Sequence, residues 1–170
     1  INAERWGVFD KRGTKLNDLV IGGKITVLDV SAYATMPNGW AIKSLVIGLT
    51  AKKLFIERMK ARRDEEFQDI KDKMEYFKEE SVLKKQEPLV WLVVDEAHEF
   101  LPAQGTSLAS QPLITILREG RQPGISLILA SQQPAKIHTD VMTQADIIVS
   151  MRLTAKIDTD ALKQLAQSYL

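Results

Sequence analysis

Cysteine is absent from the 170 residues, which excludes disulfides and thiolate metal sites and agrees with a reducing cytoplasm. No apolar run approaches the roughly 20 residues that span a bilayer, so we expect no membrane segment. An excess of one charge is also missing, since 23 Lys and Arg stand against 22 Asp and Glu. A chain with balanced charges has no overall positive electrostatic potential, so it attracts nucleic acid only through a few loops or through an assembled oligomer.

A phosphate-binding loop is missing as well. The pattern G-x-x-x-x-G-K-[ST] cradles nucleotide phosphates with backbone amides and a lysine. Its nearest approach is Gly22-Gly23-Lys24, but Ile25 follows where Ser or Thr is required, and the glycines precede an expected strand instead of a helix. We interpret this segment as a turn. The chain also starts at Ile1, without a methionine or a signal-like region, which suggests a piece of a longer protein.

Hydrophobic residues make up 45% of the chain, enough for one globular domain with a core and with no second domain. Short apolar runs predict strands, and helix-length segments separate them. This alternation is typical of an α/β protein with a parallel sheet. The runs cover 25–30, 89–94, 125–130 and 146–151, and 6–9 is a further candidate.

The spacing of apolar residues predicts a long helix from 41 to about 83, which a break near 62–66 could divide. Charges of both signs are dense over 41–87. They are typical of a solvated helix face with weak i,i+4 pairs, or of a hairpin that binds a partner or another subunit. Further helices are expected over 106–117 and 158–170.

Asp95 and Glu96 follow the apolar run 89–94 at once. Consecutive apolar residues suit a strand buried on both faces of a parallel sheet, and ligands of open α/β sheets bind at the carboxyl ends of such strands. Adjacent carboxylates there are costly unless they hold a cation or move a proton. Phosphoryl-transfer enzymes need one acid to position Mg²⁺ and another to orient or activate water. The alternative is that the pair only caps the next segment.

Two further segments carry side chains suited to a nucleotide site. Arg118 and Arg121 precede the run 125–130, and a guanidinium neutralises charge on a transferring phosphoryl group, also across a subunit boundary. A surface or structural role is the alternative for both, and we favour it for Arg118. Gln132 follows the same run, where an amide can bond a phosphate or the attacking water; otherwise it only ends a strand. We favour a structural or site-lining role for His98, because it has no ligand-spaced partner.

In combination these segments resemble the HerA/FtsK branch of the P-loop ATPases. The similarity is closest to HerA-type DNA translocases, and it is firmest from 89 to 170. It is carried by VDEAHEFLP at 94–102, LREGRQPG at 117–124, SQQP at 131–134, DII at 146–148 and RLTAK at 152–156.

The resemblance implies a RecA-like three-layer α/β/α core with a mainly parallel sheet, of which residues 1–170 form the C-terminal part. It implies a homo-hexameric ring around double-stranded DNA, with ATP at the subunit boundaries and a partner nuclease in DNA end processing and repair. Asp95 would hold Mg²⁺ through water, and Glu96 would activate the hydrolytic water. Gln132 would be the sensor, and Arg121 would reach the γ-phosphate of a neighbour.

The chain departs from this family because it has no phosphate loop and no N-terminal barrel. We therefore expect ATPase activity of the full-length protein and none of this chain alone. A two-lobed DEAH-box helicase is disfavoured, because that class expects a Ser-Ala-Thr type motif where Ser131-Gln132-Gln133 stands. A conjugation or secretion motor of the same superfamily and a non-catalytic assembly module stay open.

Overall fold

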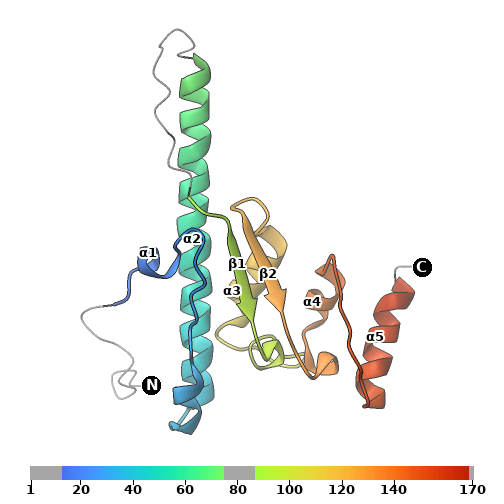
Figure 1. Ribbon diagram of the computed structural model, residues 1–170. Coiled ribbons are helices and arrows are strands. Elements are labelled where there is room, and N and C mark those ends of the chain that lie inside the picture. Colours follow the sequence, from blue (N-terminus) through green and yellow to red (C-terminus); the bar gives the residue numbers. More distant parts are fainter. Residues whose placement is uncertain (1–12, 75–86, 169–170) are drawn as a thin grey trace.

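Two adjacent parallel strands organise the described part of the chain, which comprises residues 13–74 and 87–168 of a computed structural model (Figure 1). Strand β1 covers Val90–Val94 and β2 covers Ile125–Leu129, with Val90 opposite Ile125 and Val94 opposite Leu129. Branched residues dominate both strands, as expected of half-buried pleated surfaces. The α/β class, the parallel pairing and the two central strands are therefore confirmed.

One unbroken helix, α2, runs over Gly39–Met74 and has 36 residues. The predicted break near 62–66 is wrong, because this stretch consists mainly of charged residues of high helix propensity and contains neither Gly nor Pro. Weak pairs of the predicted kind support the helix: Glu57 accepts from Lys60 at 3.1 Å, and Arg62 lies 3.3 Å from Glu66. The rest of the predicted helix, 75–83, lies outside the described residues.

Shorter helices complete the described chain. They are α1 (Leu16–Leu19), η2 (Ser31–Thr35), η3 (Ala97–Glu99), α3 (Ser110–Glu119), η4 (Pro134–Lys136), α4 (Thr139–Gln144) and α5 (Lys156–Ser168). Helix α3 begins later than predicted. Ser107 and Ser110 both donate to the carbonyl of Phe100, at 2.6 and 2.8 Å, and hold the chain before α3 in a turn. Helix α5 matches its prediction as far as the structure is described.

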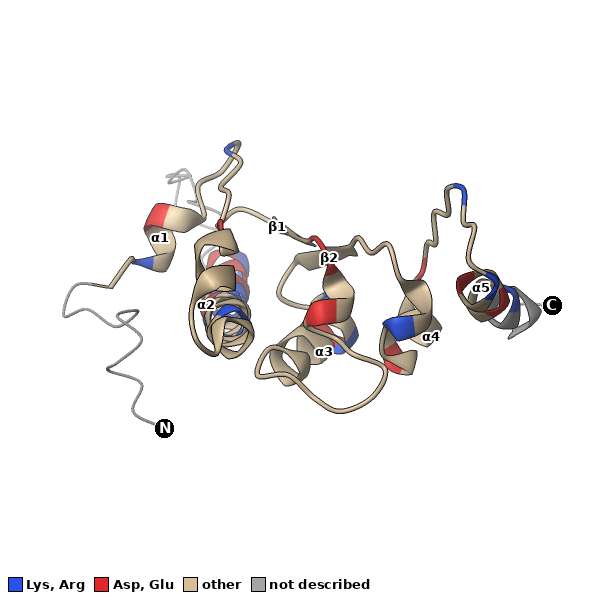
Figure 2. Cartoon of the chain, turned by 90° about the horizontal axis from the view of Figure 1, so that it is seen from below, with Lys and Arg blue, Asp and Glu red and all other residues tan. Residues whose placement is uncertain are grey.

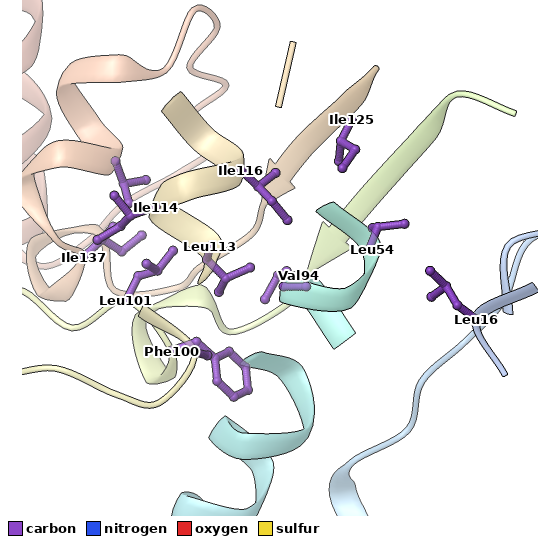
Figure 3. Close-up of a cluster of buried hydrophobic side chains, with 13 residues drawn as sticks. Leu16, Leu54, Val94, Phe100, Leu101, Leu113, Ile114, Ile116, Ile125 and Ile137 are labelled. Carbon is purple, nitrogen blue, oxygen red and sulfur yellow. The ribbon is translucent and has the colours of Figure 1, made fainter. Parts of the chain in front are cut away.

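The core lies between the strand pair and the helices α2 and α3 (Figure 3). Leu113 and Ile116 of α3 are three positions apart, so they point to the same side and meet Val94 of β1 and Ile125 of β2. Leu54 brings α2 into the same cluster. Burying each such side chain contributes about 1.5–3 kcal/mol. Figure 2 shows α2, α3 and α4 on one side of the strand pair.

The other face of the strand pair is open in the described structure. Trp91 and Val93 of β1 are 70% and 61% exposed, and Ile128 of β2 is 41% exposed. The prediction that 89–94 is buried on both faces is therefore wrong, because no described element packs on the side away from α3. Burial alternates along the strand instead, and we call the open face formed by Trp91, Val93 and Ile128 the outer face.

The strands predicted at 25–30 and 146–151 are not present in the structure. Val27 is 81% exposed and Ile147 is 83% exposed. A strand exists through ladder hydrogen bonds to a neighbour, and among the described residues only β1 and β2 form such a ladder. Apolar composition alone therefore predicted too many strands. The candidate 6–9 lies outside the described residues. None of the described helices is both long and apolar enough for a bilayer span.

Candidate active site

The carboxyl ends of β1 and β2 bring together three of the predicted site residues. Asp95 and Glu96 follow β1, and Gln132 lies just beyond β2. The Nε2 atom of Gln132 donates a hydrogen bond to Oε1 of Glu96 at 2.7 Å, although 36 positions separate the two residues. Parallel neighbouring strands end at the same edge of a sheet, so the sequence pattern predicts this meeting correctly.

Glu96 adopts a left-handed backbone conformation, with φ 48° and ψ 45°. This conformation costs a non-glycine residue about 1–2 kcal/mol, and such residues cluster at functional sites. The backbone N–H of Glu96 donates to Oδ1 of Asp95 at 2.8 Å, which holds the bend. The side chain of Glu96 makes no capping hydrogen bond to η3. Glu96 is therefore the N-cap residue of η3 by its backbone alone, and its side chain takes no part in the cap.

The second carboxylate oxygen of Glu96, Oε2, is buried and accepts no hydrogen bond within the described part of the chain. Nδ1 of His98 lies 3.4 Å from this oxygen and 3.1 Å from Oγ of Ser131, which follows β2. The hydroxyl of Ser131 also accepts from the backbone N–H of Gln133 at 3.1 Å. An unsatisfied buried acceptor is rare and needs an explanation. The Glu96 side chain as a whole is 37% exposed, so water can reach the carboxylate, as a base that takes a proton from water requires.

Asp95 is exposed beside this pair. The described residues hold no group of three or more His, Asp or Glu side chains that could hold a metal ion together. Mg²⁺ does not need such a group, because it keeps several waters and binds one or two carboxylates together with substrate phosphates. The donor set around Asp95 therefore fits Mg²⁺ that arrives with a nucleotide.

Helix α2 supports the segment that follows the acids. Nζ of Lys43 lies 2.6 Å from Oε2 of Glu99, and Nε1 of Trp40 donates to the Glu99 carbonyl at 3.2 Å. This contact was not predicted from the sequence. Glu99 belongs to the segment 94–102, but Lys43 is 56 positions away from it and stands in no motif, so no local signal indicates the pair.

Arg121 lies at the opposite end of β2, in the turn between α3 and the strand. Five residues of β2 span about 16 Å, so the structure does not bring Arg121 to Glu96 or Gln132 of the same chain. Arg121 is exposed and lines an open pocket of about 590 Å³. Arg118 forms an ion pair with Asp140 of α4, in agreement with the structural role that we favour for it.

The glycine pair at 22–23 forms a turn, as predicted. The Lys24 N–H donates to the Ile21 carbonyl at 3.1 Å, and Gly23 has a φ of 74°, which favours glycine. His138, the other histidine, accepts from the backbone N–H of Asp140 at 3.1 Å and caps α4. Neither segment belongs to the site at the carboxyl ends of the strands.

Comparisons with known proteins indicate the family of the chain. A family model described as Zonular occludens toxin (Zot) matches residues 28–161. The probable DNA double-strand break repair helicase HerA of Methanocaldococcus jannaschii is 35% identical over 78 residues, or 46% of this chain and 16% of that protein. The DNA double-strand break repair helicase HerA of Pyrococcus furiosus is 27% identical over 146 residues, or 81% of this chain and 26% of that protein. The chain thus spans about a quarter or less of the length of these curated relatives.

Proposed function

Because the chain belongs to the Zonular occludens toxin (Zot) family, and so to the HerA/FtsK-type P-loop ATPases with their RecA-like fold, we propose that it is part of the core of an ATP-driven motor. The proposed motor translocates along or unwinds double-stranded DNA during end processing and repair. Two similar proteins are named as helicases of DNA double-strand break repair, one of them as a probable one, which supports DNA as the substrate.

One observation carries the proposal at the level of chemistry. Glu96 stands in a strained conformation at the carboxyl edge of the sheet, with one carboxylate oxygen bonded to Gln132 and the other buried without a hydrogen bond among the described residues. A purely structural acid has both oxygens solvated or paired, since an unpaired buried acceptor costs about 1–3 kcal/mol. The Glu96 side chain as a whole is 37% exposed, so water can reach the carboxylate, and a carboxylate that keeps acceptor capacity free can take a proton from that water.

The residues divide the hydrolytic work. Asp95, exposed beside the base, would hold Mg²⁺ through water. Glu96 would orient the attacking water and accept its proton on the carboxylate. Gln132 fixes the other oxygen of Glu96, and it can exchange this bond for one to a γ-phosphate, so that it reports whether nucleotide is present. Bound Mg²⁺–ATP supplies the transferable phosphoryl group and the cation that neutralises its charge.

The position of Arg121 supports an assembly. The guanidinium lies at the amino end of β2 and the base at the carboxyl end, so the same chain cannot bring both to one phosphate. A head-to-tail ring places the amino end of one subunit against the carboxyl end of the next. We propose a homo-hexamer in which Arg121 completes the site of its neighbour, together with a partner nuclease.

Replacing Glu96 by Gln in the complete protein tests the function. Turnover of ATP should fall by about 10³-fold, because the amide cannot accept the proton, while ATP affinity stays within about twofold because no phosphate contact is lost. Steady-state ATPase assays and calorimetric titration measure the two quantities. Glu57→Gln, on the exposed side of α2, is the matched control. Unchanged turnover in Glu96→Gln would remove Glu96 from the catalytic role, and no turnover in the wild-type protein would favour a non-catalytic assembly module.

A further inference from the structure

Arg58 is a buried cation without a carboxylate partner among the described residues. It lies on α2 and is 5% exposed. Its Nε atom donates to the carbonyl of Pro123 at 2.8 Å, and its Nη1 atom is buried with no hydrogen bond. Taking a guanidinium out of water costs several kcal/mol. A methionine or leucine would fill the same space at lower cost, so the retained charge calls for a reason besides packing.

The carbonyl that Arg58 binds belongs to the turn that carries Arg121. This turn covers 120–124 and is closed by hydrogen bonds from Gly124 N–H to the Arg121 carbonyl at 3.2 Å and from Ile125 N–H to the Gly120 carbonyl at 2.7 Å. Pro123 is fully buried, whereas Arg121 is exposed. One side of the turn is therefore fixed against α2, and the other side presents a guanidinium.

Gly124 leaves room for this arrangement. It has a φ of 75°, and a Cβ atom at this position would lie 2.5 Å from Cδ2 of Leu89 and 3.3 Å from Nη2 of Arg58. The guanidinium of Arg58 thus packs against the turn backbone itself. A shift of Arg58 must move the turn, because the contact is with backbone and no flexible side chain lies between them.

Arg121 is the arginine of this surface that stays available. Arg62 and Arg118 line the same open pocket, but Arg62 pairs with Glu66 and Arg118 pairs with Asp140. Within the described residues Arg121 has no ion pair.

We propose that Arg58 is the positioning residue for Arg121: it fixes the 120–124 turn so that Arg121 points out of the subunit toward the phosphate of a neighbour. The proposal rests on the proposed function. The new element is that one buried hydrogen bond couples α2 to the trans-acting arginine. Arg58 itself touches no nucleotide.

A double-mutant cycle in the complete protein tests this role. Arg58→Met keeps the volume and removes the donor, and its kcat should fall by about 10-fold with an unchanged KM for ATP, because a misplaced group loses transition-state contact without loss of substrate binding. Arg58→Met combined with Arg121→Ala should be no slower than Arg121→Ala alone, since both changes act through one group. Arg58→Lys keeps the charge but loses the Nε donor, and it should lie between wild type and Arg58→Met.

Leu16→Ala, a core change on α1, is the control for lost stability and should leave kcat unchanged at temperatures below its melting transition. Losses that multiply in the double variant would overturn the positioning role, as would an Arg121→Ala variant with full turnover. Should Arg58→Met fail to fold, the same cycle is run with Arg58→Lys. Failure of the proposed function is separate, because it appears in Glu96→Gln and not in this cycle.

Discussion

The two ends of the β1–β2 pair have opposite characters. At the carboxyl end, Asp95 and Glu96 present carboxylates, and Gln132 is bonded to Glu96 across the two strands. At the amino end, a glycine-bounded turn presents Arg121, which has no ion pair among the described residues, next to the buried Arg58. The available charged groups therefore have opposite signs at the two ends of the strand pair.

This difference suggests how the chain associates. A short rigid strand cannot fold its two ends together, so a base and an arginine placed at opposite ends serve one phosphate only if two copies meet head to tail. Such heterologous contacts close into rings when the rotation permits. The charges at the two ends are complementary, which favours this order over its reverse.

The largest expected effect on ATPase activity comes from substitutions at the two ends of the strand pair, each carried by a different subunit. Glu96→Gln and Arg121→Ala should each reduce ATPase activity by about 10³-fold when assembled alone. Rings formed from an equal mixture should recover roughly a quarter of wild-type activity, because that share of boundaries carries an intact copy of both residues if subunits mix at random. ATPase assays after mixing measure this rescue. A mixture as inactive as either variant would contradict the division of the site between subunits.

A smaller effect is expected at the carboxyl end alone. Gln132→Ala removes the donor that holds Glu96 and should lower kcat by about 100-fold. The melting temperature should change little, since Gln132 is exposed. Steady-state kinetics and calorimetry measure both quantities. Gln144→Ala, an exposed change at the end of α4, is the matched control. Equal kinetics of the two variants would remove Gln132 from the site.

The smallest expected effect concerns the support of the carboxyl end by α2. Lys43→Ala breaks the ion pair with Glu99 and should lower the free energy of unfolding by about 1 kcal/mol, because both side chains are partly accessible to water. Urea titration measures this loss, and added salt should shrink the difference from wild type by screening the pair. A loss of several kcal/mol would mean that this end depends on α2 as strongly as the amino end.

Much of the carboxyl end could be predicted from the sequence. Branched runs ending in polar residues predict β1 and β2, and parallel pairing then brings Glu96 and Gln132 together. The amino end could not be predicted in the same way. Arg58 and Pro123 are 65 positions apart. In a helix rich in charged residues, the sequence does not distinguish one buried arginine from the solvated ones. Only the packing of α2 against the turn distinguishes it.

The predicted strands at 25–30 and 146–151 are wrong for a different reason. Residues 25–30 and 146–151 have strand composition, but pairing is a property of two segments and composition is a property of one. Likewise the left-handed backbone of Glu96 has no sequence signal, because glutamate rarely adopts it. The sequence thus predicts which residues are apolar enough for a strand, and the tertiary structure decides which of them have a neighbour.

The length of α2 has a mechanical consequence. From Arg58, where the helix holds the turn, to its described end at Met74 the axis extends by about 24 Å, past the strands in Figure 1. A tilt of about 10° about Arg58 displaces the far end by about 4 Å. The contacts of Trp40, Lys43 and Leu54 fix the preceding part of α2 to the core, so a displacement of this size requires the helix to bend near Arg58.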